Sequence, residues 1–186
     1  MKDRVLKKDY RDYKSKNIAI IGHMGSGKSF IGRLIGKKLG YKHIDSDKLI
    51  ITKTGKSIQN IFQHDGEEKF RDLEEKTIIA LNIKNKLVLS LGGGSILSAT
   101  VRKFLINNFI TLFLDTDLKL ICERLKKSSK RPLLLNVNVE EKIEELDIIR
   151  RKYYLLADIV LKNINKPEDI IINFIEKYNK LDEKNN

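Results

Sequence analysis

The sequence predicts an α/β domain in which helices flank a parallel sheet. Short apolar runs alternate along the chain with segments whose apolar residues recur at helical spacing. No two successive runs lie close enough to form a hairpin, so neighbouring strands must be joined through helices, which predicts about five strands in a mostly parallel sheet. A chain of 186 residues suits one such domain, and no repeat or linker is visible.

The expected strands are short, and the first and third are apolar runs, as strands buried on both faces of a parallel sheet should be. They cover residues 17–21, 41–45, 87–91, 109–114 and 158–161. The first strand runs directly into a glycine-rich loop, and the third runs directly into three consecutive glycines. Ligands bind at the carboxyl ends of strands in open α/β sheets, so both loops are candidate site elements.

The expected helices follow from apolar spacing and from capping residues. They cover 28–39 with Gly40 as C-cap, 46–54 with Ser46 as N-cap, 57–65 with Ser57 as N-cap, 67–84, 98–107, 118–127, 139–156 and 167–181. The last begins with Pro167, Glu168 and Asp169, which suit the start of a helix. Residues 128–138 are mostly polar and predict a mobile lid. We therefore expect a basic extension over 1–16, one domain over 17–181 and a polar tail over 182–186.

Composition excludes several classes of protein. Apolar residues make up 41% and charged residues 33% of the chain, which is the balance of a folded domain. No apolar run approaches the ~18–20 residues needed to span a bilayer, so we expect no membrane contact. Residues 1–16 lack the apolar core of a secretory signal. Cys122 stands alone and so forms no internal disulfide. Together these features predict a cytoplasmic protein.

The net charge of +12, from 37 basic and 25 acidic residues, raises the question of a nucleic-acid partner. A nucleotide-switched nucleic-acid-binding protein would have clustered Lys and Arg together with stacking aromatic residues. Here the basic residues are spread along the chain, there is no Trp, and the Tyr and Phe residues are scattered. We therefore expect anionic small-molecule substrates, no nucleic acid, and a monomer.

Residues 22–29 read Gly-His-Met-Gly-Ser-Gly-Lys-Ser and join the first expected strand to the first helix. This is the pattern G-x-x-x-x-G-K-[ST] of a phosphate-binding loop, in the strand–loop–helix context that such a loop requires. Its glycines let backbone N–H groups converge on a phosphate, and the helix adds the positive end of its dipole. Lys28 suits the β- and γ-phosphates, and the Ser29 hydroxyl suits Mg²⁺. The chain is therefore predicted to bind a nucleoside triphosphate.

Asp45 and Asp47 follow the second expected strand. Beside a magnesium nucleotide, two carboxylates can divide their roles: one holds metal-bound water, and the other accepts a proton from an attacking hydroxyl. The alternative is that Asp45 merely ends a strand and Asp47 decorates a helix N-terminus. The neighbouring phosphate-binding loop favours the functional interpretation.

Several cations further along the chain are candidate ligands. Arg71 and Glu74 lie three residues apart on one expected helix and can pair there. The glycines at 92–94 remove every side chain from a strand end, which lets a ligand approach the backbone. Arg131 lies in the expected lid, and Arg150 and Arg151 lie on a late helix. Taken alone, Arg71 and Glu74 would be read as an ordinary surface ion pair, and the alternative for each other arginine is a solvated surface charge.

The ordered set of these motifs resembles the shikimate kinase family, over residues 17–175. The matching pieces are 22–29, Asp45-Ser46-Asp47, Gly66-Glu67 with Phe70-Arg71 and Glu74, 92–94, Arg131-Pro132-Leu133-Leu134, and Arg150 with Tyr154 and Ala157-Asp158. The resemblance implies a small P-loop kinase that transfers the γ-phosphoryl group of ATP to the 3-hydroxyl of shikimate, on the route to chorismate and aromatic amino acids. Another small-molecule P-loop kinase, for gluconate or a nucleotide, is the alternative.

The resemblance also implies roles for individual residues. Gly25, Ser26, Gly27, Lys28, Ser29 and Phe30 would hold the ATP phosphates, while Ser29 directly and Asp45 through water would hold Mg²⁺. Asp47 would hold and deprotonate the shikimate hydroxyl. The substrate would be bound by Arg71, Gly93 and Arg150, with Glu74 orienting Arg71. The lid residue Arg131 would bind ATP and stabilise the transferred group, which makes Lys28, Asp47 and Arg131 the expected catalytic residues.

The chain departs from the family pattern in two places. The family has a proline two residues after the substrate arginine, where this chain has Lys152. Spacing to Tyr154 selects Arg150, but Arg151 stays an alternative. For the adenine contact, Lys166 lies where the family often has a basic residue, and Arg124 and Lys127 are alternatives.

Overall fold

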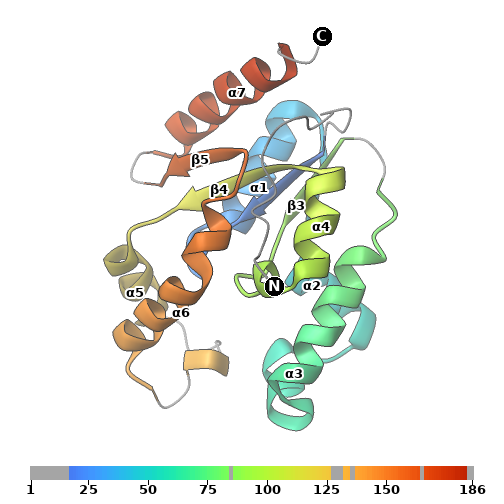
Figure 1. The fold of residues 1–186 in the computed structure, drawn as a ribbon, viewed down its shortest axis with the longest axis vertical. Helices are drawn as coiled ribbons and strands as arrows, with labels where there is room; N and C mark the ends of the chain where they lie inside the picture. Colours follow the sequence, from blue (N-terminus) through green and yellow to red (C-terminus); the bar gives the residue numbers. More distant parts are fainter. Residues whose placement is uncertain (1–16, 84–85, 127–131, 135–136, 164–165, 184–186) are drawn as a thin grey trace, which may run out of the picture.

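The computed structural model describes residues 17–83, 86–126, 132–134, 137–163 and 166–183. The five strands are β1 (Ile18–Ile21), β2 (Lys42–Asp45), β3 (Leu87–Ser90), β4 (Ile110–Asp115) and β5 (Ile159–Lys162). They form one sheet in the order β2-β3-β1-β4-β5, and every neighbouring pair is parallel. The predicted α/β class, with a parallel sheet of five strands, is confirmed (Figure 1).

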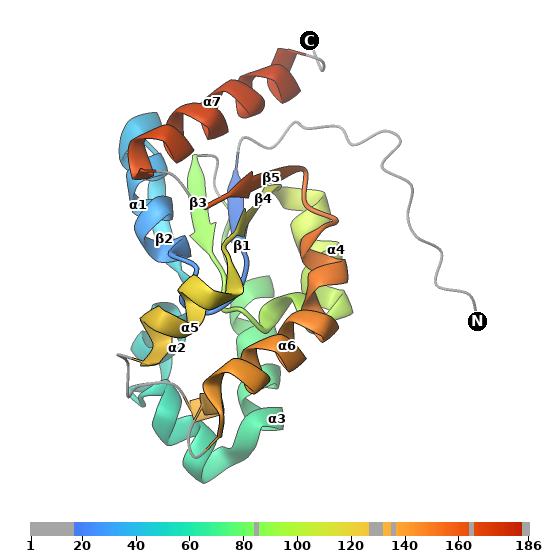
Figure 2. The same cartoon turned by 90° about the vertical axis from the view of Figure 1, so that its left-hand side faces the viewer.

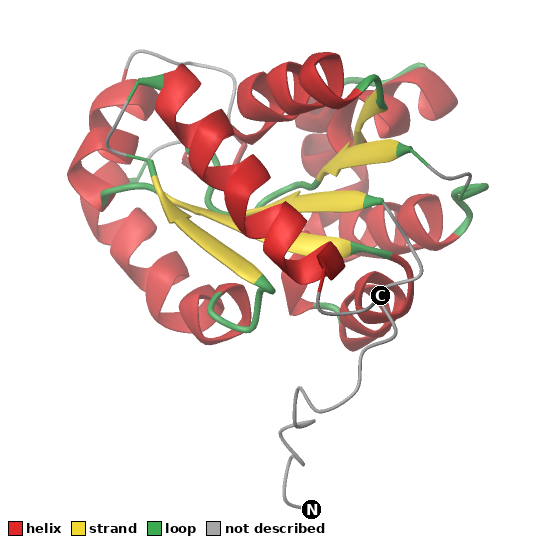
Figure 3. Cartoon of the chain, turned by 90° about the horizontal axis from the view of Figure 1, so that it is seen from above, coloured by secondary structure: helices red, strands yellow, loops and turns green. Residues whose placement is uncertain are grey.

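Helices cover both faces of this sheet. They are α1 (Lys28–Leu39), α2 (Ser46–Thr54), α3 (Ile58–Ile79), α4 (Ala99–Asn108), α5 (Leu118–Lys126), α6 (Val139–Tyr154) and α7 (Pro167–Glu183), with short 3₁₀ helices η1 (Ser95–Leu97) and η2 (Pro132–Leu134). Figure 2 shows α1 and α7 on one face of the sheet, with α4 and α6 on the other, and Figure 3 shows helices on both sides of the strands.

Alternate residues of β1 explain why the sheet needs two helical layers. Ile18 and Ile20 pack with Ile31 and Ile35 of α1 and with Phe174 of α7. Ala19 and Ile21, which point to the opposite face, pack with side chains of α3, α4 and α6. Every residue of β1 is therefore buried, which accounts for its uninterrupted apolar sequence.

Two capping predictions, those for Gly40 and Ser57, are confirmed. Gly40 and Gly55 end α1 and α2 in the left-handed conformation, with φ of 68° and 67°. Ser57 caps α3 by accepting a hydrogen bond from the Asn60 N–H. The Ser98 hydroxyl likewise accepts from the Val101 N–H at 3.0 Å, so the helix predicted over 98–107 begins one residue later.

Other boundary predictions need correction. The cap of α2 is Asp45, whose side chain accepts from the Lys48 N–H, and the buried Ser46 hydroxyl instead accepts from the Gly92 N–H at 2.9 Å. The two helices expected on either side of Gly66 are joined into α3 across a kink, where Gly66 has φ of 82° and ψ of 169°. The second of them ends at Ile79 rather than at residue 84.

The regions expected to lie outside the core fall largely beyond the described residues. The extension over 1–16 is not described, and of the expected lid only 132–134 and 137–138 are. Helix α7 continues to Glu183, past the expected boundary at 181. Within the described part of the chain, no helix has both the length and the apolar character needed to cross a membrane.

Candidate active site

The parallel sheet brings the predicted site residues to one edge. The glycine loop follows β1, Asp45 ends β2, and the glycines at 92–94 follow β3. Because β2, β3 and β1 are neighbours and parallel, these three segments lie side by side at the carboxyl ends of the strands. Helices α3 and α6 supply arginines to the pocket at this edge.

The phosphate-binding loop folds around the Lys28 side chain. Lys28 Nζ donates to the carbonyl oxygens of Gly22 at 2.8 Å and His23 at 2.6 Å, and only 8% of the residue is exposed. Gly22 has φ of 143°, and a Cβ there would lie 2.9 Å from the Leu114 carbonyl oxygen, so only glycine fits. The ammonium group is therefore fixed before any phosphate arrives.

Side chains behind the loop hold its carbonyl groups. The Gly25 carbonyl accepts from Arg124 Nη1 at 3.1 Å. The Ser26 carbonyl accepts from Asn163 Nδ2 at 2.7 Å and from the Thr116 hydroxyl at 3.2 Å. These hydrogen bonds to the loop carbonyls hold the loop in a conformation that directs backbone N–H groups toward an anion at the start of α1. The sequence analysis did not select Asn163 or Thr116, although both follow strands that end at this edge.

Two side-chain oxygens lie close together beside the loop. The Ser29 hydroxyl donates a short hydrogen bond to Asp45 Oδ2, across the gap between α1 and β2. The other carboxylate oxygen of Asp45 caps α2, so its side chain is fixed from two directions. A hydroxyl and a carboxylate next to a phosphate site are the oxygen donors that suit a hard divalent cation.

A pocket with about 430 Å³ of empty space opens next to the loop. The residues that line it come from four helices and two loops: Met24, Asp47, Ile58, Phe62, Phe70, Arg71, Glu74, Gly92, Gly93, Gly94, Pro132, Leu133 and Arg150. The pocket brings together all four residues that were expected to bind the substrate, Asp47, Arg71, Gly93 and Arg150. Arg131 lies outside the described residues, but its neighbours Pro132 and Leu133 line this pocket.

Arg71 is held against the triple glycine by two carboxylates. Arg71 Nη1 donates to Glu74 Oε2 at 2.8 Å, and its Nε and Nη2 donate to Glu67 at 3.2 and 3.0 Å. A Cβ on Gly94 would lie 2.4 Å from the Arg71 guanidinium carbon. A Cβ on Gly92 would lie 2.4 Å from Glu74 Oε1 and 2.9 Å from Asp47 Oδ1. Gly92 and Gly94 are therefore required because charged side chains occupy the space beside them.

The two adjacent arginines of α6 have different surroundings. Arg150 is 1% exposed and lines the pocket, and its Nε and Nη1 are buried without a hydrogen-bond partner. Burial lowers the pKa of the Arg150 guanidinium, and the nearby Arg71 charge adds to this effect. The Arg151 side chain is 39% exposed and pairs with Asp115 at 3.4 Å. Arg150 thus reaches the pocket, whereas Arg151 faces the end of β4.

His23 was missed by sequence analysis because its position in the loop motif is unrestricted. Its side chain is buried, and Nε2 lies 2.8 Å from Asp147 Oδ1 of α6. Its ring contacts Tyr154 edge-to-face, with centroids 5.2 Å apart. The Tyr154 hydroxyl donates to the Gly93 carbonyl at 2.6 Å, and burial raises the pKa of this hydroxyl so that it stays protonated. No local sequence signal marks either contact.

We expect folding stability to decline as the pH falls from about 6.5 toward 5, the range below the ordinary histidine pKa. Burial lowers the pKa of His23 in the folded protein, although Asp147 opposes this shift. The unfolded chain therefore binds more protons in this range, and the free energy of unfolding falls by at most ~1.4 kcal/mol per pH unit for this group. Urea denaturation at several pH values measures the slope, which His23→Gln should reduce. An unchanged slope in the variant would contradict the assignment.

The parallel sheet, the phosphate-binding loop and the adjoining oxygen ligands define a small P-loop phosphotransferase. A model of the shikimate kinase family matches residues 24–179, which is most of the chain. The chain belongs to the shikimate kinase family. It is therefore an ATP-dependent kinase that acts on an alcohol group, as the resemblance in its motifs implied.

Individual relatives agree with this assignment. A shikimate kinase from Thermodesulfovibrio yellowstonii is 38% identical over 167 residues, which cover 89% of this chain and 96% of the relative. The solved structure of a shikimate kinase from Acinetobacter baumannii in complex with shikimate superposes with a TM-score of 0.83 and 34% identity. That match covers 88% of this chain and 92% of the other.

The alternative acceptor, gluconate, receives no comparable support. A gluconokinase from Sinorhizobium meliloti superposes over 90% of this chain with a TM-score of 0.58, but the two sequences are only 16% identical. That likeness shows a shared fold and nothing about the acceptor.

Proposed function

We propose that the pocket beside the loop holds shikimate, with Arg71 and Arg150 binding its carboxylate and Asp47 binding its 3-hydroxyl. The observation that carries this proposal is the buried Arg150, whose Nε and Nη1 lack protein partners while Arg71 and Asp47 line the same pocket. A buried cation with free donors favours an anionic ligand, because leaving it unpaired is costly. Planar guanidinium groups suit a carboxylate in particular.

We further propose that the loop from Gly25 to Phe30 holds the ATP phosphates. Lys28 supplies the fixed positive charge, and Ser29 and Asp45 hold Mg²⁺, with Asp45 acting through water. The hydrogen bond between Ser29 and Asp45 supports this, since both oxygens already lie together. The metal would neutralise charge on the phosphates. Asp47 accepts the proton of the attacking hydroxyl, and Arg131 from the lid stabilises the transferred group.

For the adenine ring, Arg124 is the best placed of the three candidate cations. Its guanidinium already reaches the loop, where Nη1 donates to the Gly25 carbonyl. Lys166 is exposed, and Lys127 lies outside the described residues. We propose that Arg124 covers the base.

We propose that the protein is a monomer in the cytoplasm. The net charge of +12 opposes self-association, and Cys122 is a buried free thiol, which suits a reducing compartment that supplies ATP. Light scattering of the purified protein measures its molar mass and so tests whether it is a monomer.

Arg150→Ala is expected to raise KM for shikimate about 10- to 150-fold, the equivalent of ~1.5–3 kcal/mol for a lost hydrogen bond to a charged group. KM for ATP should change little, because the loop is untouched. Arg150→Lys should be a poor replacement, since an ammonium cannot form the planar fork. Lys152→Ala, which removes an exposed cation from the same helix outside the pocket, is the matched control and should leave KM for shikimate unchanged. A coupled ADP-release assay measures all of these values.

The methyl ester of shikimate identifies which group the arginine contacts. The ester lacks the negative charge, so it should be a weak substrate, and Arg150→Ala should harm it less than it harms shikimate. This is a double-mutant cycle with the ligand as one partner. Equal losses for acid and ester would show that Arg150 does not bind the carboxylate. If Arg151→Ala instead shows the coupling, the wrong neighbour has been chosen.

A further inference from the structure

The inner face of α6 carries four polar side chains at helical spacing: Asp147, Arg150, Arg151 and Tyr154. Three of them bind three different segments at the edge of the sheet. Asp147 binds His23 of the phosphate-binding loop, Arg151 binds Asp115 at the end of β4, and Tyr154 binds the Gly93 carbonyl. Arg150 lies among these three anchors. Its orientation toward the pocket therefore depends on how α6 is held.

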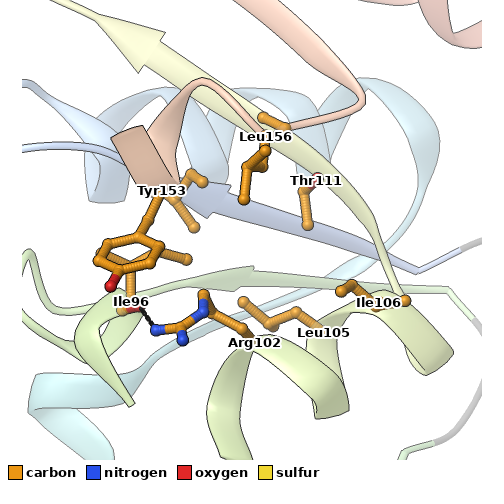
Figure 4. A pocket seen from close by; sticks show the side chains of 9 residues that line it. Ile96, Arg102, Leu105, Ile106, Thr111, Tyr153 and Leu156 are labelled. Carbon is orange, nitrogen blue, oxygen red and sulfur yellow. Dashed lines mark hydrogen bonds between the residues drawn. The ribbon is translucent and has the colours of Figure 1, made fainter. Parts of the chain in front are cut away.

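A fourth contact holds the same helix through a second pocket, which the site does not use (Figure 4). Arg102 lies there over the Tyr153 ring, with its guanidinium carbon 4.1 Å from the ring centroid. Arg102 Nη1 donates to the carbonyls of Ile96 and Leu97, both at 2.8 Å. These contacts attach the Arg102 side chain to η1 through its hydrogen bonds and to α6 through the Tyr153 ring. Arg102 therefore joins α6 to η1.

Of the four contacts, the bond between His23 and Asp147 differs because it reaches the loop that binds phosphate. The side chains are 3% and 14% exposed, and they join residues 124 positions apart. The backbone carbonyl of His23 also accepts from Lys28 Nζ at 2.6 Å. One residue thus touches the phosphate-binding lysine through its backbone and the helix of Arg150 through its side chain.

Charge and burial fix the direction of this bond. His23 Nδ1 is buried without a partner, so a proton there would be unsatisfied, and the ring is placed to carry its proton on Nε2 and donate to Asp147. Burial lowers the pKa of His23, Lys28 and Arg150 lower it further, and Asp147 alone among the facing groups raises it. A neutral ring therefore donates one directed hydrogen bond to a carboxylate.

We propose that His23 and Asp147 are positioning residues. Their hydrogen bond holds α6 against the phosphate-binding loop and thereby orients Arg150 toward the acceptor substrate. The inference rests on the proposed role of Arg150. Neither residue touches the substrate in this scheme. Without their bond, α6 keeps its contacts to β4 and to Gly93 and the ring contact of Tyr154 with His23, but loses its hydrogen bond to the loop that holds Lys28.

Paired substitutions test the bond itself. His23→Phe keeps a ring against Tyr154 but donates no hydrogen bond, and Asp147→Leu keeps volume but accepts none. Asp147→Leu also removes the ion pair of Asp147 with Arg151 at 3.5 Å, whereas His23→Phe leaves that pair in place. Each should raise KM for shikimate about tenfold, while KM for ATP stays within about twofold. Asp147→Asn retains an acceptor oxygen and His23→Gln retains an N–H donor at similar reach, so both should stay within about threefold of the parent. The double variant His23→Phe/Asp147→Leu should be no worse than the worse single variant. Glu145→Gln, at the exposed Lys142 pair of α6, is the control and should match the parent.

Two outcomes would overturn the proposal. The first is that the variants unfold at a lower temperature but, assayed below that temperature, have the same KM for shikimate as the parent. The bond would then contribute to stability alone. The second is additive losses in the double variant, which would show no coupling. Should His23→Phe fail to fold, the contrast between Asp147→Leu and Asp147→Asn decides alone. Arg150→Ala measured in the same series separates the two proposals: a normal KM in that variant removes the acceptor assignment, whereas normal His23 and Asp147 variants remove only this inference.

Discussion

Lys28→Ala is expected to lower kcat by about 10²–10³-fold or more, the scale for removing a principal electrostatic contact from an active site. The reason is preorganisation. Lys28 Nζ is already held by two loop carbonyls, and the residue is almost fully buried. In the proposed site its charge would therefore act on the β- and γ-phosphates with no reorganisation during the transfer. In water the same charge would be hydrated and screened.

Two further variants separate the charge from the fold. Lys28→Met keeps most of the aliphatic stem but carries no charge, so it should lose nearly as much activity as Lys28→Ala while unfolding closer to the parent. Lys37→Ala removes an exposed lysine from the last turn of the same helix and should leave kcat unchanged. Steady-state assays with saturating shikimate give these values. Turnover of Lys28→Ala within a few-fold of the parent would remove the phosphate assignment.

Asp47→Asn is expected to lower kcat by ~10²-fold or more, the usual scale for a positioned general base. Asp47 is in the first turn of α2, and its carboxylate lines the pocket next to Gly92. Asparagine keeps the shape and much of the hydrogen bonding, but it cannot take up the proton of the attacking hydroxyl. Binding of MgADP should therefore remain near the parent value, as calorimetry would measure.

The control for this experiment is Asp72→Asn, because Asp72 forms an exposed pair with Lys76 on the outer side of α3. It removes the same charge outside the pocket and should leave kcat unchanged. The opposite pattern for Asp47→Asn, with nucleotide binding lost and turnover of the remaining complex preserved, would make Asp47 a metal-binding or structural residue instead of a base.

Much of the fold and of the candidate site could be predicted from the sequence, because the signals are local. The five strands and the helices between them are set by apolar spacing, glycine caps and chain connections, which involve neighbouring residues. The loop over 22–29 carries its phosphate chemistry in eight consecutive residues, and Asp45 and Asp47 gain meaning from following a strand. The order of these short motifs also identified the family. Boundary errors arose where two neighbouring residues could both cap a helix, as Asp45 and Ser46 could. The Ser46 hydroxyl bonds to the Gly92 N–H, so Asp45 caps α2 instead.

The tertiary structure decided what depends on contacts between distant segments. Adjacent helical residues point about 100° apart, so the sequence could not distinguish Arg150 from Arg151, whereas the docking of α6 buries one and leaves the other at β4. The strand order β2-β3-β1-β4-β5 was likewise fixed by which faces pack together. The contact between His23 and Asp147 spans 124 residues and left no pattern in either local sequence. A single buried hydrogen bond has no periodicity, and it exists only because the sheet brings the end of β1 beside α6.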